Sequence, residues 1–125
     1  MLLGNFFTVS DRVASGNKVA ATLDINAKHP IFEGHFPGQP VVPGVCMMQM
    51  MKELLEVEIN CKTQLRKADF LKFLAVINPV ENPRVSVEFS HEQNADADIS
   101  VTGRLYKDAI TFVKFKGNFI LKANS

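Results

Sequence analysis

The sequence has no tryptophan, only two cysteines and almost no net charge, and these shortages exclude several classes of protein. A formal net charge of +1 gives no support for a broad nucleic-acid-binding surface. Cys46 and Cys61 do not have the spacing of metal ligands, so we predict no metal site. Cys46 lies in an apolar run, which predicts a buried free thiol and fits a reducing cytoplasm better than secretion.

Long hydrophobic runs are also lacking. The first residues, Met1 to Asn5, have neither the charged region nor the apolar stretch of a signal peptide. The longest nearly apolar stretch, Val45 to Met51, is far shorter than the roughly 20 residues of a membrane-spanning helix. We therefore predict a soluble, cytoplasmic protein with no membrane association.

The 125 residues are enough for one domain and too few for two, so we expect a single domain over residues 1–125. Hydrophobic residues make up 46% of the chain, and a domain of this size can bury a core without disulfides or metals. Ten phenylalanines, with the aliphatic residues, are expected to fill that core.

One helix and several strands are expected from the hydrophobic pattern. Val45 to Val57 contains neither Pro nor Gly, is rich in helix formers and is apolar on nearly every face of its first half, which predicts a buried helix. A single buried helix has to be covered by sheet, so we predict an α+β fold with a strongly curved antiparallel sheet. The expected strands show alternating or Phe-rich patterns and span Phe6–Ala14, Lys18–Ile25, Ala68–Ile77, Arg84–Ser90, Ile99–Tyr106 and Ile110–Leu121, with a turn at residues 15–17 and a polar connection over residues 91–98.

The segment from His29 to Gly44 is dense in proline and glycine and is expected to be a loop of fixed shape. With the start of the helix it reads HPIFEGHFPGQPVVPGVCMMQMMKE, which closely resembles the signature of β-hydroxyacyl-acyl-carrier-protein dehydratases of the FabZ type, the hotdog-fold enzymes of fatty-acid synthesis. The positions that match are Pro30, Phe32, Gly34, His35, Phe36, Pro37, Pro40, Pro43, Gly44 and Val45.

The resemblance implies a hotdog fold and assigns roles to individual residues. His35 takes the α-proton of a 3-hydroxyacyl thioester, since histidine has a pKa near neutral pH. The backbone N–H of Gly44, at the positive end of the helix dipole, stabilises the negative charge on the thioester oxygen. Apolar side chains are expected to form the walls for the acyl chain, and these are Phe36, Val42 and Met48.

The sequence departs from the family pattern at the acid. The family places Glu or Asp fourteen residues after the histidine, and this position is Gln49 here, with Glu53 one helical turn later. An amide can hydrogen-bond a leaving hydroxyl but is not an acid. Gln49 and Glu53 share one helix face and lie about one turn apart. Two interpretations stay open: Glu53 acts as the acid, directly or through water, or Gln49 only positions the hydroxyl.

The implied reaction is the reversible loss of water from a 3-hydroxyacyl group on acyl carrier protein, giving the trans-2-enoyl thioester. No cofactor is required, because the substrate brings its own phosphopantetheine arm. The resemblance also implies a homodimer or a larger homo-oligomer, with His35 of one subunit facing Gln49 and Glu53 of the other.

Less specific interpretations remain for these residues. His35 could be structural, His29 is expected to shape the loop before Pro30, His91 to open a polar turn, and Glu53 could be a solvated helix residue. The methionines of the helix are most simply core or dimer contacts. A surface group of Lys62, Arg66, Lys67 and Lys72 is either a solvated face or a docking site for an acidic carrier protein. At the level of function, the alternatives are an acyl-thioesterase and a non-catalytic acyl-binding partner subunit.

Overall fold

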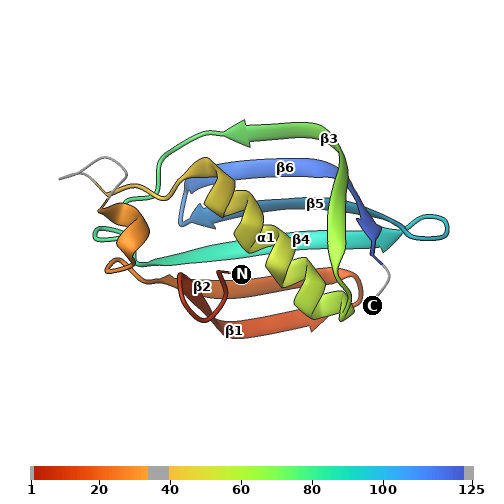
Figure 1. The fold of residues 1–125 in the computed structure, drawn as a ribbon, viewed down its shortest axis with the longest axis horizontal. Coiled ribbons are helices and arrows are strands. Elements are labelled where there is room, and N and C mark those ends of the chain that lie inside the picture. Colours follow the sequence, from red (N-terminus) through yellow and green to blue (C-terminus); the bar gives the residue numbers. More distant parts are fainter. Residues whose placement is uncertain (1, 34–39, 123–125) are drawn as a thin grey trace.

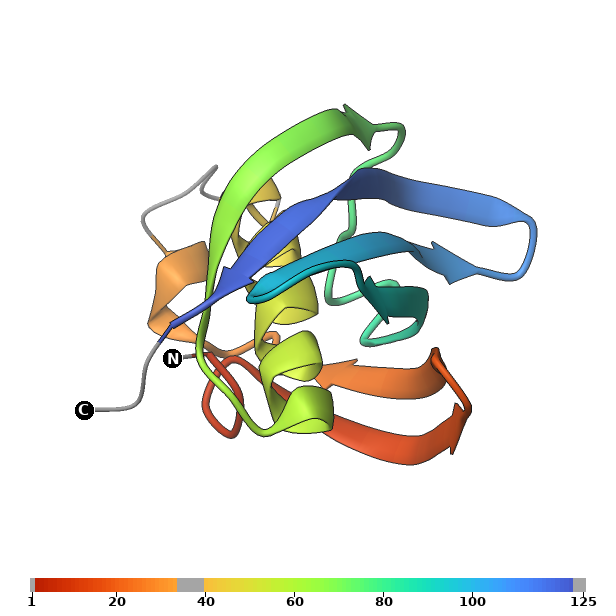
Figure 2. The ribbon, with the colours of Figure 1, turned by 90° about the vertical axis from the view of Figure 1, so that its right-hand side faces the viewer.

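The computed structural model describes residues 2–33 and 40–122. They form one six-stranded antiparallel sheet and one long helix that lies on one face of it (Figure 1). The sheet curves around the helix, as Figure 2 shows. The order of elements is β1 (Phe7–Ser15), β2 (Lys18–Ile25), the short 3-10 helix η1 (Pro30–Phe32), α1 (Gly44–Ile59), β3 (Thr63–Phe73), β4 (Arg84–Gln93), β5 (Asp98–Lys107) and β6 (Ile110–Leu121).

The strands lie in the order β1-β2-β4-β5-β6-β3, so β3 leaves the helix and pairs at the far edge of the sheet. β1 and β2 form a hairpin, and the turn between them contains Gly16 with a φ of 61°, a conformation that favours glycine. Among residues 2–33 and 40–122, β1 and β3 are the two edge strands, and β3 pairs with β6 alone. The free edge of β3 is therefore available for further pairing.

The core lies between α1 and the inner face of the sheet. Alternate residues of the central strands point toward the helix, as the period-2 pattern requires. The helix contributes two methionines and two leucines at helical spacing, Met50, Met51, Leu54 and Leu55. The buried side chains that face them include Val19, Leu23, Val85, Val87, Phe89, Val101, Leu105, Val113 and Phe115.

The expected α+β architecture is confirmed, and the bounds predicted for β2 and β6 match the structure. The helix starts one residue earlier than expected and ends two residues later, at Ile59. The C-cap residue Asn60 has a left-handed conformation, and its N–H donates to the carbonyl of Glu56. The helix is buried on one side only, because Val45 remains 78% exposed. Cys46 is a buried free thiol, as expected.

Two strand predictions need correction. β3 covers residues 63–73 rather than 68–77, because its polar first half pairs with β6 while both of its faces remain largely exposed. β4 extends through His91 to Gln93, which pairs with Ile99, so only residues 94–97 form the connection. His91 therefore lies inside a strand and does not open a turn. In the part of the chain that the structure describes, no helix is long and apolar enough to cross a bilayer.

Candidate active site

A cavity of about 520 Å³ lies between the first half of α1 and the edge strand β3. Three of the predicted site residues line it: Gly44, Met48 and Gln49. Gly44 and Met48 are four residues apart and so share one helix face, and Gln49 follows Met48 directly. The other lining residues are Val45 and Lys52 from α1, Leu65, Leu71 and Phe73 from β3, and Phe119 from β6.

A larger hollow of about 650 Å³ lies against outward-facing side chains of the central strands, among them Ala20, Glu88 and Thr102. None of the predicted site residues that the structure describes lines it. We therefore take the smaller cavity as the candidate site, because Gly44, Met48 and Gln49, three of the predicted site residues, line it.

Gly44 begins the helix against the ring of Phe73. A Cβ atom at Gly44 would lie 2.9 Å from Cζ of Phe73, so the absence of a side chain at this position allows the close contact. Phe73 is 51% exposed at the end of β3, and the sequence analysis missed it. Phe73 is followed by two further exposed apolar residues, Leu74 and Val76, so no local pattern in the sequence distinguishes it as a site residue.

The N-terminus of α1 has the properties of an anion-binding end. Pro43 is the N-cap residue and provides no side-chain hydrogen bond to the first turn. The earliest N–H groups of a helix have no partner within the helix, and the helix dipole adds partial positive charge there. Gly44 supplies one of these N–H groups at the wall of the cavity.

Gln49 lines the cavity and also contacts Glu53. Its Nε2 atom donates a hydrogen bond to Oε2 of Glu53 over 2.9 Å. A carboxylate accepts hydrogen bonds, so the amide nitrogen of Gln49 has to face Glu53. The contact thus fixes the orientation of a side chain that reaches the candidate site.

Glu53 lies behind Gln49, away from the lining of the cavity, and is only 1% exposed. The backbone N–H of Leu2 donates to both of its oxygens, over 3.0 Å to Oε1 and 2.8 Å to Oε2. The N–H of Leu3 donates to Oε1 over 2.8 Å. The interpretation of Glu53 as a solvated helix residue is therefore wrong, because the carboxylate is buried and satisfied by protein donors.

The remaining predicted residues lie elsewhere. Val42 is buried in the core, where its N–H donates to the carbonyl of Ile77 over 2.9 Å, and it is not among the residues that line this cavity. His35 and Phe36 lie outside the described residues. His29 shapes the loop as expected, since its Nδ1 accepts a hydrogen bond from the N–H of Ile31 over 3.1 Å and caps η1. Burial raises the pKa of the Cys46 thiol, which fits a core residue.

The curved sheet around one helix is the hotdog fold, and solved structures with this fold overlie most of the chain. The dehydratase heterocomplex ApeI:P from Xenorhabdus doucetiae has a TM-score of 0.71 at 15% identity and covers 91% of this chain and 97% of its own. A thioesterase from Pseudomonas aeruginosa has a TM-score of 0.62 at 8% identity and covers 92% of this chain and 80% of its own. At these identities the likeness concerns the fold alone.

The sequence comparisons identify the family. The family model described as ApeI-like, ApeI dehydratase, matches residues 11–111, which include the whole motif from His29 to Glu53. The chain therefore belongs to the ApeI-like dehydratase family. A 3-hydroxyacyl-[acyl-carrier-protein] dehydratase FabZ from Geotalea uraniireducens is 28% identical over 94% of this chain and 89% of its own length. A FabZ from Symbiobacterium thermophilum is 36% identical over 66% of this chain and 65% of its own length.

Proposed function

We propose that this protein removes water reversibly from a 3-hydroxyacyl thioester carried on acyl carrier protein, giving the trans-2-enoyl thioester. The observation that carries the proposal is the cavity at the start of α1, where Gly44 and Gln49 border one apolar space. An N–H group and a polar side chain at one end of an apolar cavity suit an acyl thioester. The dehydratases that the chain resembles act on substrates of this class by name.

The proposed roles follow from the chemistry of the elimination. The imidazole of His35 takes the α-proton, and the electron pair of that C–H bond forms the new C=C bond as the β-C–O bond breaks. The N–H of Gly44, with the helix dipole, stabilises the charge on the thioester oxygen. The amide of Gln49 hydrogen-bonds the β-hydroxyl, and the protonated imidazole returns its proton to the departing oxygen, so that water leaves.

The walls for the acyl chain are apolar side chains from three elements. Met48 comes from α1, Leu71 and Phe73 from β3, and Phe119 from β6. Burial of one methylene group in such a site is worth about 0.8 kcal/mol. Phe36 is proposed to complete these walls from the loop, and Val42 to support them from the core.

A second copy of the chain is the proposed partner of the free edge of β3. The strand exposes Leu65, Leu71 and Phe73, and these same side chains border the cavity, so the site is open toward that edge. Exposed apolar side chains on an unpaired edge favour association. In such a dimer, His35 of one subunit is proposed to face Gln49 of the other, as the family resemblance implies. The solved ApeI protein forms a heterocomplex, which makes a related dehydratase chain the alternative partner.

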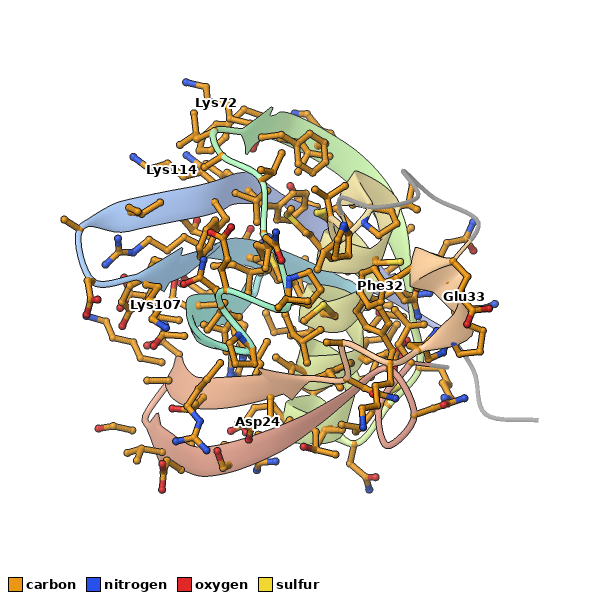
Figure 3. All side chains as sticks on the ribbon, turned by 90° about the vertical axis from the view of Figure 1, so that its left-hand side faces the viewer. Asp24, Phe32, Glu33, Lys72, Lys107 and Lys114 are labelled. Carbon is orange, nitrogen blue, oxygen red and sulfur yellow. The ribbon has the colours of Figure 1, made fainter. Side chains whose placement is uncertain are left out.

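The acidic carrier protein is proposed to dock on a basic group beside the cavity. Lys72 and Lys114 are direct cross-strand partners of β3 and β6 and point outward, as Figure 3 shows. Like charges directly opposite each other are destabilising, so an acidic partner that covers both would relieve the repulsion. Lys72 is next to Leu71 and Phe73 in the sequence, which places this pair near the cavity on the other face of β3.

The decisive experiment supplies 3-hydroxyacyl and trans-2-enoyl groups on acyl carrier protein and follows three products. Conversion of the 3-hydroxyacyl thioester to the enoyl thioester, or the reverse, supports the proposal. Free thiol would identify a thioesterase instead, and no product with retained binding would identify a non-catalytic acyl-binding subunit.

The docking surface is tested in the same assay with the double variant Lys72→Glu and Lys114→Glu. It should have a raised KM for the carrier-protein thioester and an unchanged KM for a short thioester that is not attached to a protein.

A further inference from the structure

Glu53 holds a fully buried carboxylate that accepts four hydrogen bonds. Oε1 accepts from the N–H groups of Leu2 and Leu3, and Oε2 accepts from the N–H of Leu2 and from Nε2 of Gln49, all between 2.8 and 3.0 Å. Isolated buried charge is costly, and this arrangement offsets the cost by satisfying both oxygens. In all four contacts the oxygens of Glu53 act as acceptors.

Three of the four hydrogen bonds come from a compact N-terminal turn, residues 2–7, which lies beside α1 (Figure 1). The carbonyl of Leu2 accepts hydrogen bonds from the N–H groups of Asn5 over 3.1 Å and Phe6 over 2.8 Å. The ring of Phe6 is fully buried and lies 5.4 Å from the ring of His29 and 5.6 Å from that of Phe32. Glu53 is therefore bound to a turn that is itself fixed in the core and against η1.

Glu53 and Gln49 differ in their access to the candidate site. Gln49 lines the cavity, whereas Glu53 reaches it only through the 2.9 Å hydrogen bond to Gln49. A rotatable amide that has to present one end to a substrate gains from a fixed partner at its other end, because misplacement by about 1 Å can reduce a rate by about 10²-fold.

We propose that Glu53 is a positioning residue: its carboxylate, held by the backbone N–H groups of Leu2 and Leu3, fixes the Gln49 amide at the wall of the cavity. The expected change in kcat rests on the proposed dehydratase function. The fixed orientation of the Gln49 amide rests on the geometry alone. It assigns to Glu53 a role different from that of the acid.

The experiment compares Glu53→Gln with the wild-type chain and uses Glu56→Gln as the matched control. Glu56 is a carboxylate of the same helix that accepts from the N–H of Thr63 over 2.7 Å and does not contact Gln49. The first readout is the NMR signal of the Gln49 side-chain amide, assigned by its loss in Gln49→Met. In the wild type one amide proton should be shifted downfield by the carboxylate. Glu53→Gln should remove this shift, and Glu56→Gln should preserve it.

The second readout is kinetic. Glu53→Gln should lower kcat by about 10- to 10²-fold while KM stays within about twofold, and the pH profile of kcat/KM should keep its shape. If Glu53 were the acid, the substitution would instead remove the limb in which activity falls as the pH rises. That result, or an unchanged Gln49 amide signal in Glu53→Gln, would overturn the proposal.

A second pair of variants guards against loss of folding in Glu53→Gln. Leu2→Pro removes the N–H that contacts both oxygens, whereas Leu2→Ala shortens the same side chain and keeps the N–H. The Gln49 amide signal should change in the first and not in the second, and equal signals in both would contradict the inference. If the wild type turns over no thioester, the proposed function fails, and the NMR comparison still decides the role of Glu53.

Discussion

Gln49→Glu tests whether the candidate site lacks an acid. Gln49 lines the cavity, and its Nε2 lies 2.9 Å from Oε2 of Glu53. Glutamate has nearly the same shape as glutamine, so the introduced carboxyl would occupy the position of the amide. Two carboxyl groups would then lie within hydrogen-bond distance of each other, one facing the cavity and the other behind it.

The magnitude of their interaction follows from that distance. Two unit charges about 3 Å apart repel each other by about 6 kcal/mol at an effective dielectric constant near 20. A repulsion of this size strongly disfavours the state in which both carboxyls are ionised. The pair therefore keeps one proton at neutral pH, and the carboxyl at position 49, which borders the cavity, can donate it to a hydroxyl bound there.

The variant should gain a proton donor at the cavity. If proton delivery to the leaving hydroxyl limits the wild-type reaction, the rate should rise by about 10²- to 10⁴-fold. The gain should disappear as the pH rises through the pKa of the pair, because the donor is then deprotonated. Conversion of a 3-hydroxyacyl carrier-protein thioester, measured from pH 5 to pH 9, gives both quantities.

A stability measurement checks the same reasoning without turnover. The pKa of the pair is higher in the folded variant than in the unfolded chain, so its contribution to stability is present at low pH and is lost as the pH rises through the folded value. The Tm of Gln49→Glu, relative to the wild type, should therefore fall with rising pH. A rate and a Tm profile identical to those of the wild type would refute the argument.

Three further predictions concern other parts of the molecule. His35→Ala should lower kcat by about 10²- to 10⁴-fold with an unchanged circular dichroism spectrum, and a wild-type kcat would make His35 structural. Sedimentation should detect an oligomer at micromolar concentration, and a folded monomer there would exclude pairing through β3. The amide of Asn94, with Arg66 and Asn118, holds the pKa of Asp98 below its usual range. A carboxyl whose pKa is lower in the folded protein than in the unfolded chain stabilises the fold at a pH above the unfolded pKa, and this stabilisation is lost as the pH falls through the folded pKa. Asp98→Asn should therefore lower Tm at pH 7 and leave it unchanged at a pH below the folded and unfolded pKa of Asp98. An equal loss of Tm at every pH would contradict this.

The sequence predicts an element well where the element has one buried and one exposed side, because hydrophobic residues then recur at a regular spacing. β2 and β6 alternate clearly, and their bounds were predicted from the sequence. β3 could not be placed in this way, because its middle residues are exposed on both faces of an edge strand and give no period of two. The end of β4 was missed for a related reason, since His91 to Gln93 are polar although they pair with β5.

The site could be predicted where its residues are near in sequence. Gly44, Met48 and Gln49 belong to one helix, where Gly44 and Met48 share a face by helical spacing and Gln49 follows Met48 directly. Phe73 comes from a strand far along the chain, and nothing local marks its contact with Gly44. The contact of Glu53 with Leu2 and Leu3 spans about 50 residues and uses backbone N–H groups, which every residue but proline has.

The position of the carboxylate on α1 decides which chemistry it can support. A shift of four residues leaves it on the same helix face and moves it along the axis by about 6 Å, from the cavity to the N-terminal turn. At the first position a carboxyl would face a substrate hydroxyl, where its proton is useful. At the second, the position of Glu53, it meets three N–H donors, which favour an acceptor. The pair of groups is the same in both orders, but only one order gives the cavity an acid. Gln49→Glu puts a carboxyl at that position, and it therefore tests this site more directly than deleting either side chain.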